Sequence, residues 1–494
     1  MGSLDLLLGG LATAMQPENL LFALVGSIIG TLIGILPGVG PVAGTALLLP
    51  VTFKMEATSA IIMLTSIYYG AMYGGTLTSV LVNVPGEAAS AITCIDGHEM
   101  AKRGRAGSAL AVSAIGSFVG GMVAIAGLVL LAGPLTRLAL LFGPPEFFAL
   151  MLVGLSLVIG LAGKSIALAL ASAVLGLLVA MVGIDPVMGA PRFTFGSINL
   201  MGGIDVVVVA MGLFGVGEIL VALEREAATS VIATRLRELM PTREEARRSV
   251  APIARGTAIG FLLGLVPGIG AVVPTIMSYV AERKLSATPE KFGTGMIEGV
   301  AGPETANNAY ANAALVPLFT LGIPASPTIA VLLGAFMMNG LTPGPFLFKE
   351  KPDFVWGVIA SLYVGNLILV VLNLPLVGIW VKLLKTPRSI LFSLVLAFTV
   401  VGAFVTSNSV FDIGVLLAFG VVGYLFTKMG IPIAPMAFTV ILGPLTENAL
   451  RQALAMSGGE LDVLARGWIS TGLLVLAAVV LAWSVFAAVR RARP

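Results

Sequence analysis

A short polar stretch, "PETANNAYAN" at residues 303–312, lies inside a long apolar part of the sequence. On an α-helix Glu304, Asn308 and Asn312 would share one face, with Asn307 beside Glu304. Ionisable groups inside a membrane are costly and usually face a cavity or a transport path. A carboxylate with amide oxygens suits Na⁺ or a proton rather than a soft metal. We therefore predict an ion-coupling site, and the alternative is a polar seam between packed helices.

The stretch "YYGAMYGGTLTSVLVNVPGEAAS" at residues 68–90 has a similar place in the first half of the chain. It brings hydroxyl groups and one amide to a V-P-G break, but no carboxylate aligns with Glu304. The two halves are therefore not chemically equivalent. Together the two stretches give the predicted ion-coupling residues: Thr76, Ser79, Glu304, Thr305, Asn307, Asn308 and Asn312.

Two P-G-x-G motifs, "ILPGVGP" (35–41) and "LVPGIGA" (265–271), interrupt apolar segments. Proline ends the preceding helix, and glycine lets the chain turn and lets a ligand approach the backbone. A helix that restarts after such a break presents free N–H groups and a positive dipole end, which suit an anion. The alternative for each motif is a kink that serves packing only. With the breaks near 83 and 326, the predicted substrate-binding residues are Pro37, Gly38, Gly40, Asn83, Pro85, Gly86, Ser90, Pro267, Gly268, Gly270, Pro324, Ser326 and Thr328.

The chain contains an internal repeat, because three motif pairs keep their order at a slowly growing offset. The pairs are "GTLIGILPGVG" (30–40) with "GFLLGLVPGIG" (260–270), "NVPGEAASA" (83–91) with "GIPASPTIA" (322–330), and "GLLVAMVGI" (176–184) with "GYLFTKMGI" (423–431). Fixed-order similarity over the whole length indicates duplication rather than chance. We expect two transmembrane repeats, 1–235 and 236–494, joined by a cytoplasmic linker at about 224–255.

The charge pattern indicates that the two repeats cross the membrane in opposite directions. Basic residues mark cytoplasmic loops, and both 224–255 and "GHEMAKRGRAG" (97–107) are rich in them. The second-half counterpart of the latter, "LFKEKPDF" (347–354), has no net charge and would lie outside. Inverted repeats of this kind build their sites from broken helices. The segments 84–95, 324–338 and 431–443 are too short to cross a bilayer easily and are predicted to be re-entrant or half helices.

Composition predicts an all-α polytopic membrane protein. Hydrophobic residues make up 57% of the 494 residues and charged residues 11%, against about 25% charged in soluble domains. Cys94 and His98 are the only residues of their types, which excludes an internal disulfide and a Cys- or His-based metal cluster. The sequence has no Walker lysine loop and no catalytic signature. We expect no enzyme activity, no ATP-driven motor, no cofactor beyond a coupling cation, and no nucleic-acid partner.

At three long motifs the sequence resembles the large membrane subunit of tripartite tricarboxylate transporters, the TctA family. The motifs are "GILPGVGPVAGTALLLP", "YYGAMYGGTLTSVLVNVPGEAASAITCIDG" and "GVAGPETANNAYANAALVPLFTLGIPASPTIAVLLGAFMMNGLTPGPFLF". The stretches "RFTFG" (192–196) and "GLFGVGEIL" (212–220) also fit. The resemblance extends over essentially the whole chain.

The resemblance implies a function that the residues alone do not give. Such subunits work with a small membrane subunit and a periplasmic solute-binding protein. They import citrate-like carboxylates across a bacterial inner membrane and use an ion gradient instead of ATP. The resemblance implies that three parts of the chain hold candidate site residues: the two P-G-x-G breaks, Asn83 to Glu87, and Glu304 to Asn308. It does not fix the substrate, and the alternative function is a membrane channel or scaffold without ion-coupled transport.

Overall fold

The computed structural model describes residues 3–36, 39–161, 165–185, 188–224, 240–384 and 388–492, and most of them are helical. In this part of the chain, seven helices are long and apolar enough to cross a membrane. The prediction of an all-α polytopic membrane protein is therefore confirmed. The only sheet among the described residues is a two-stranded antiparallel hairpin, which pairs Gly183 with Arg192.

The helices fall into two groups, one on each side of residues 225–239, which lie outside the described residues. The first group is α1 (Ser3–Ala14), α2 (Pro17–Ile35), α3 (Gly40–Leu48), η1 (Leu49–Thr52), α4 (Ala57–Val82), η2 (Ala88–Ile92), α5 (Thr93–Lys102), α6 (Ala106–Ala139), α7 (Pro144–Leu161), α8 (Ile166–Ala180), β1 (Gly183–Ile184), β2 (Pro191–Arg192), η3 (Ile198–Leu200), α9 (Val206–Ala210), the π-helical η4 (Met211–Val216) and α10 (Gly217–Glu224). The second is α11 (Arg243–Gly264), α12 (Val272–Leu285), η6 (Pro289–Lys291), α13 (Glu298–Ala313), α14 (Leu315–Leu321), α15 (Pro327–Met338), α16 (Pro345–Glu350), α17 (Pro352–Asn373), α18 (Val377–Leu383), α19 (Arg388–Ser407), α20 (Val410–Met429), α21 (Ile433–Met456), η7 (Leu461–Ala465) and α22 (Trp468–Ala492).

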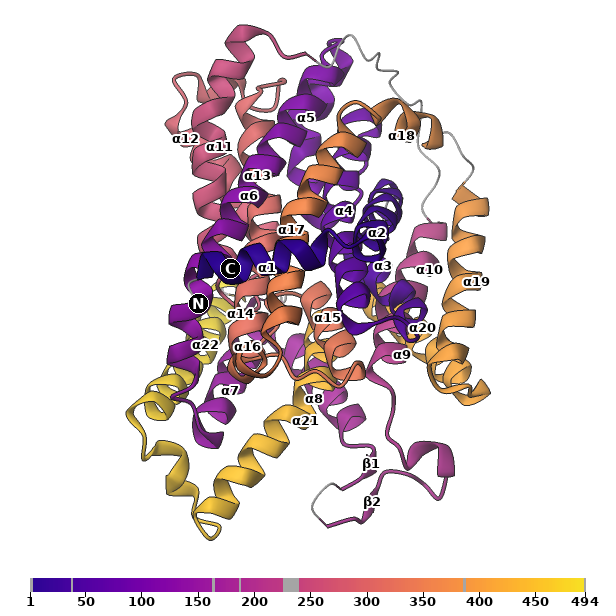
Figure 1. The fold of residues 1–494 in the computed structure, drawn as a ribbon, viewed down its shortest axis with the longest axis vertical. Helices are drawn as coiled ribbons and strands as arrows, with labels where there is room; N and C mark the ends of the chain where they lie inside the picture. Colours follow the sequence, from indigo (N-terminus) through magenta and orange to yellow (C-terminus); the bar gives the residue numbers. More distant parts are fainter. Residues whose placement is uncertain are drawn as a thin grey trace.

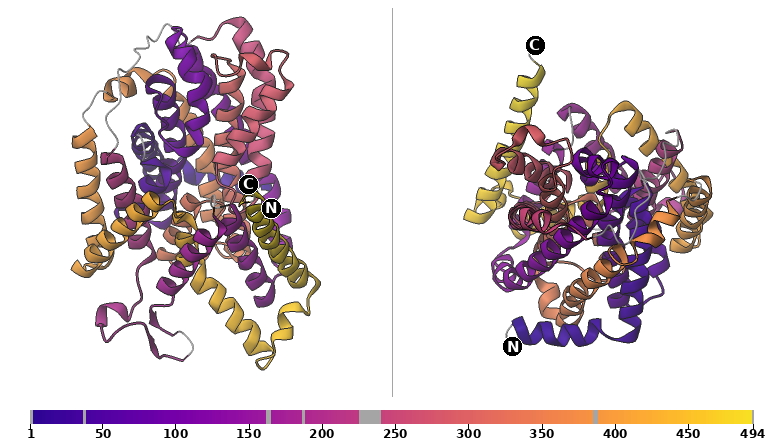
Figure 2. Two further views of the ribbon diagram at one scale, coloured as in Figure 1. Left: turned by 180° about the vertical axis from the view of Figure 1, so that it is seen from behind. Right: turned by 90° about the horizontal axis from the view of Figure 1, so that it is seen from above.

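The two groups interleave in one elongated bundle (Figure 1). Helices α5, α11, α12 and α18 lie toward one end, while α7, α8, α21 and the β-hairpin lie toward the other. Seen along the long axis, α1 and α22 lie at the rim of the bundle (Figure 2). The central helices α4 and α13 are almost completely buried, so the polar residues that they carry lie inside the protein.

Both P-G-x-G motifs interrupt the helices, as the sequence predicts. Helix α2 ends at Ile35, and α3 begins at Gly40, which has a φ of +63°. Helix α11 ends at Gly264, and Gly268 and Gly270, with φ of +83° and +71°, precede α12. These left-handed conformations are available to glycine at little cost, which explains why glycine stands at these positions.

Glycine also sets the distance between the main helix pairs. A Cβ atom on Gly30 of α2 would overlap the carbonyl oxygen of Ile67 in α4, and one on Gly260 of α11 would overlap that of Ala306 in α13. Close backbone contact between membrane helices depends on such small residues. The contacts advance in the same direction along both helices, so each pair is parallel. Glycines one turn before and one turn after these positions make similar close contacts, Gly26 and Gly34 in α2 and Gly256 and Gly264 in α11.

Two of the predicted short segments have the wrong bounds. The segment 431–443 belongs to α21, a helix of 24 residues that continues to Met456. The apolar run ends earlier because the last turns are polar, and Arg451 ties them to Asp185 beside the β-hairpin. The segment 84–95 is a loop and the 3-10 turn η2, and the helix that follows, α5, runs through the polar stretch to Lys102.

Helix α5 forms in a polar stretch because the second group of helices holds it. The Asp96 carboxylate accepts hydrogen bonds from the backbone N–H groups of Gly293, Gly295 and Met296 and from the Tyr279 hydroxyl. Asp96 is completely buried. A long-range contact of this kind has no signature in hydrophobic periodicity, so the sequence predicts a loop here instead of a helix.

The glycine contacts give a stability prediction. Gly260→Ala should lower the free energy of unfolding by about 1–3 kcal/mol, because the new methyl group overpacks the contact with Ala306. Gly414→Ala in α20 is the matched control, because no atom lies within 4 Å of its added Cβ. This control should be neutral or stabilising by up to about 1 kcal/mol, since alanine favours helix. Thermal unfolding of the purified variants in detergent measures both, and equal stability of the two would contradict the packing argument.

Candidate functional site

A cavity of about 510 Å³ lies where four interruptions of the helices meet. The interruptions contribute residues 39–43, 85–89, 268–272 and 326–328 to its lining. Two interruptions come from each group of helices, so sequence positions more than 200 apart share one cavity. The structure thus brings together seven of the predicted substrate-binding residues: Gly40, Pro85, Gly86, Gly268, Gly270, Ser326 and Thr328.

Each interruption places the start of a helix at the cavity. Helices α3, α12 and α15 and the 3-10 turn η2 begin at or next to lining residues. The first N–H groups of a helix have no partner within the helix and carry its positive dipole end. Among the described lining residues there is no Lys, Arg or His. Attraction for an anion would therefore come from backbone N–H groups, as at other helix N-termini.

Hydrogen bonds join two of the interruptions directly. The Gly268 N–H donates to the Ala325 carbonyl oxygen at 3.0 Å, and the Tyr310 hydroxyl donates to the same oxygen at 3.0 Å. Gly268 itself is fixed against α7, because an added Cβ would lie 3.0 Å from the Val158 nitrogen. The second P-G-x-G break and the loop before α15 therefore form one wall of the cavity.

The wall opposite comes from the first group. A Cβ on Gly86 would overlap the Gly34 carbonyl oxygen, so the loop after α4 lies directly on α2. Asn83 ends α4 with a left-handed φ of 57°, and Gly322 ends α14 with a φ of 72°. Asn83 is exposed and does not line the cavity. Its place at the helix end gives it a conformational role, since asparagine tolerates this conformation well.

Glu304 lies beside the cavity in a cluster of neutral donors. Its two carboxylate oxygens accept hydrogen bonds from the hydroxyl groups of Thr76 in α4 and Thr93 in α5. Glu304 is 1% exposed, and none of the salt bridges between described residues includes it. Donors from the first group thus hold a carboxylate of the second group inside the bundle.

The amides of α13 add buried acceptors to this cluster. Asn307 donates from Nδ2 to the Glu87 carboxylate at 2.8 Å, and Asn308 donates from Nδ2 to the Ser117 hydroxyl at 2.7 Å. The Oδ1 atoms of both asparagines are buried and have no hydrogen-bond donor among the described residues. Buried acceptors normally have a partner. Oxygen acceptors in excess over donors are suited to a hard cation.

The other predicted ion-coupling side chains bond to nearby backbone. Thr305 donates to the Ala301 oxygen, Asn312 to the Asn308 oxygen, and Ser79 to the Gly75 and Ser90 oxygens. These bonds fit a structural role in α13 and α4. Three predicted substrate-binding residues near the cavity do not line it, Ser90, Pro267 and Pro324, and Pro37 and Gly38 lie outside the described residues.

Several lining and supporting residues were not predicted from the sequence. Tyr68 and Tyr310 line the cavity. Thr93 and Ser117 reach Glu304 and Asn308 from α5 and α6. Single hydroxyl residues in apolar helices give no sequence signal for such contacts. In the structure, a buried polar atom without a hydrogen bond of ordinary geometry marks such a residue. The Tyr68 hydroxyl is one example among the described residues.

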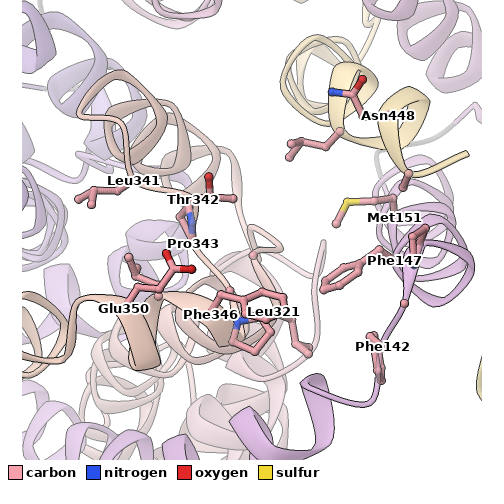
Figure 3. A pocket seen from close by; sticks show the side chains of 18 of the residues that line it. Phe142, Phe147, Met151, Leu321, Leu341, Thr342, Pro343, Phe346, Glu350 and Asn448 are labelled. Atoms are coloured by element: carbon pink, nitrogen blue, oxygen red, sulfur yellow. The ribbon is translucent and has the colours of Figure 1, made fainter. Parts of the chain in front are cut away.

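A second cleft of about 630 Å³ lies between α7, α21 and the loop before α16 (Figure 3). Phe142, Phe147 and Met151 of one wall face the loop around Pro343 and Phe346 in the other. Its lining is mostly apolar and contains none of the predicted site residues. Helices α7 and α21 reach from this cleft to the cavity, because each contributes residues to both. We therefore place the candidate site at the smaller cavity.

Comparison with known proteins gives one family and two relatives. The profile of the tripartite tricarboxylate transporter TctA family matches residues 20–438. A protein of Agrobacterium vitis described as "Uncharacterized 52.8 kDa protein in TAR-I ttuC' 3'region" is 45% identical over 475 residues, which cover 96% of this chain and 95% of the relative. A second, "Uncharacterized protein in TAR-II ttuC' 3'region" from the same organism, is 43% identical over 234 residues, 47% of this chain and 97% of the relative. No solved structure matches.

The two cavity tyrosines give a stability prediction. Tyr310→Phe removes the hydrogen bond to Ala325 and should lower the free energy of unfolding by about 1 kcal/mol. Tyr68→Phe is the matched control, because the Tyr68 hydroxyl makes no hydrogen bond of ordinary geometry among the described residues. This substitution should lower the free energy of unfolding by less than about 0.5 kcal/mol or should raise it. Thermal unfolding in detergent compares the two. A larger loss for Tyr68→Phe than for Tyr310→Phe would show that the hydrogen bonding described above is wrong.

Proposed function

The chain belongs to the tripartite tricarboxylate transporter TctA family, and on this premise we propose that it is the large membrane subunit of an ion-gradient-driven transporter for tricarboxylates or related organic acids. The family is one of transporters and not of enzymes. In this proposal a small membrane subunit completes the membrane part, and a periplasmic solute-binding protein delivers the substrate. The assembly would lie in a bacterial inner membrane and import the acid without ATP.

One observation carries the proposal, the convergence of four helix interruptions on a single cavity. Its volume of about 510 Å³ falls within the range of about 300–1,000 Å³ that is usual for small-molecule sites. Backbone N–H groups at the helix starts would bind the substrate carboxylates. Ser326 and Thr328, which line the cavity at the start of α15, add hydroxyl donors.

The coupling ion would bind in the polar cluster beside this cavity. Glu304 supplies a negative charge, and the Oδ1 atoms of Asn307 and Asn308 supply acceptors without donors. This set suits Na⁺, and a proton on a carboxylate is the alternative coupling ion. The hydrogen bond from Asn307 to Glu87 joins the cluster to the cavity wall. Ion and substrate would then bind as neighbours.

We also propose that the two groups of helices are inverted repeats of 1–235 and 236–494. The glycine contacts of α2 with α4 recur in α11 with α13 at the positions that the sequence repeat pairs. Arg105, which follows α5, forms a salt bridge with Glu245 near the start of α11, so two basic segments lie at one end of the bundle. By the positive-inside rule this end would face the cytoplasm.

Uptake of labelled citrate tests the function. Proteoliposomes that contain this chain and the small membrane subunit, supplied with the solute-binding protein, should accumulate citrate when a Na⁺ or proton gradient is imposed. Asn308→Ala removes one amide oxygen, which is worth about 1–3 kcal/mol in a buried site, so uptake at limiting ion concentration should fall about tenfold or more. Glu304→Gln should reduce it further because it removes the charge.

Glu99→Gln is the matched control, because Glu99 lies at the surface of α5 and its carboxylate bonds, among the described residues, only to Lys102. Its uptake should equal that of the unaltered protein. Normal uptake by Glu304→Gln and Asn308→Ala together would refute the ion site. Uptake that does not saturate and ignores the gradient would identify a channel.

A further inference from the structure

Glu87 places a carboxylate in the cavity that is proposed to bind an anion. It lines the cavity and is 8% exposed. No salt bridge among the described residues includes it. A bound carboxylate would therefore meet a second negative charge in the same space. In the low dielectric of a protein interior this repulsion is much stronger than in water.

The Glu87 side chain lies against α4, where glycine leaves room for it. A Cβ atom on Gly75 of α4 would lie 3.0 Å from the Glu87 Cγ atom. Its Oε1 atom accepts a hydrogen bond from Asn307, and its side chain also faces the Ser90 N–H in a capping box at the start of η2.

Two further oxygen atoms beside Glu87 have no donor. Asn307 and Tyr68 are both 0% exposed. The Asn307 Oδ1 atom makes no hydrogen bond with the described residues, and the Tyr68 hydroxyl lies near the Ser326 side chain without a hydrogen bond of ordinary geometry. Because the two ends of an amide are interchangeable by half a turn, Asn307 can present Oδ1 instead of Nδ2 to a ligand beside Glu87. Carboxylate, amide and hydroxyl oxygens are the ligands of a hard cation.

The other charged or titratable groups near Glu87 do not neutralise it. They are Glu304 and Tyr310 on α13, Tyr68 on α4, and Glu218 on α10. All four are acidic or neutral. Either a cation that binds with the substrate or a proton on Glu87 must therefore remove this charge if the anion is to bind next to it.

We propose that Glu87 is a ligand of the coupling cation, so that a Na⁺ ion held by Glu87, Asn307 and Tyr68 is the direct counter-ion of the bound organic acid. This inference rests on the proposed function. It extends the ion cluster from Glu304 to the wall of the cavity and adds two residues to it, Glu87 and Tyr68. The cation turns the repulsion by Glu87 into attraction, so each ligand binds tightly only when the other is present.

Two measurements on the purified chain in detergent test this role. The first is thermal unfolding over a NaCl series without substrate, with choline chloride to keep the ionic strength constant. A bound ion stabilises the folded state, so Na⁺ should raise the unfolding temperature of the unaltered protein and of Glu99→Gln. The shift should be absent in Glu87→Gln, partly restored in Glu87→Asp, and reduced in Tyr68→Phe.

The second measurement is citrate binding by calorimetry over the same NaCl series. If one Na⁺ binds with each citrate, citrate affinity below ion saturation should rise about tenfold for each tenfold increase in Na⁺. Glu87→Gln should bind citrate with no dependence on Na⁺, and Glu99→Gln should behave like the unaltered protein.

Three outcomes would overturn the inference. Glu87→Gln could keep the full Na⁺ response in both measurements, or the response could be lost in Glu304→Gln alone. Binding could also follow pH and ignore Na⁺, which would place a proton on the site instead. Failure of the proposed function looks different, because the unaltered protein would then bind no citrate although the Na⁺ shift in unfolding temperature, and its loss in Glu87→Gln, would remain.

Discussion

Close contact between helix backbones is the constraint on which the rest of this structure depends. Gly30 and Gly260 bring α2 against α4 and α11 against α13 at distances that no side chain would permit. The chain breaks that follow α2 and α11 both contribute residues to the cavity. The cavity exists because both breaks reach the same region, where the loops before η2 and α15 also end. Packing of small residues therefore determines where chemistry can take place.

The electrostatics of the cavity follow from this construction. A site built from helix starts attracts anions through backbone dipoles, which cannot move away or be neutralised by a proton. Its charge is small, however, and Glu87 opposes it. The polar cluster on the other side of Glu87 has the opposite character, since the buried Oδ1 atoms of Asn307 and Asn308 lack donors. In the proposed function, an anion site short of positive charge and a cluster of oxygen acceptors short of donors thus share one wall.

The sequence predicted the parts of the site that depend on local structure. Proline and glycine break helices wherever they stand, so the interruptions near Gly40, Gly86, Gly268 and Ser326 could be read directly, and the structure brings them to one cavity. Contacts between distant segments could not be read in this way. Thr93 and Ser117 are single hydroxyl residues in helices whose partners are known only after folding. For the same reason the sequence did not predict the bounds of α5 and α21. Asp96 of α5 is held by the backbone of residues 293–296, and the polar end of α21 is held by the salt bridge of Arg451 with Asp185.

The proposed duplication would account for the shape of the site but not for its chemistry. The repeat pairs Asn83 with Gly322, and both end a helix in the left-handed conformation. It also pairs Glu87 with Ser326, and both begin the next element and line the cavity. One position thus carries a carboxylate and its counterpart a hydroxyl. A symmetric cavity would offer an anion two equal groups at these positions, whereas this one offers a hydroxyl donor at Ser326 and, in the proposed function, a charge at Glu87 that requires a cation. In the function proposed here, the asymmetry between Glu87 and Ser326 would make the two ligands depend on each other, which coupled transport requires.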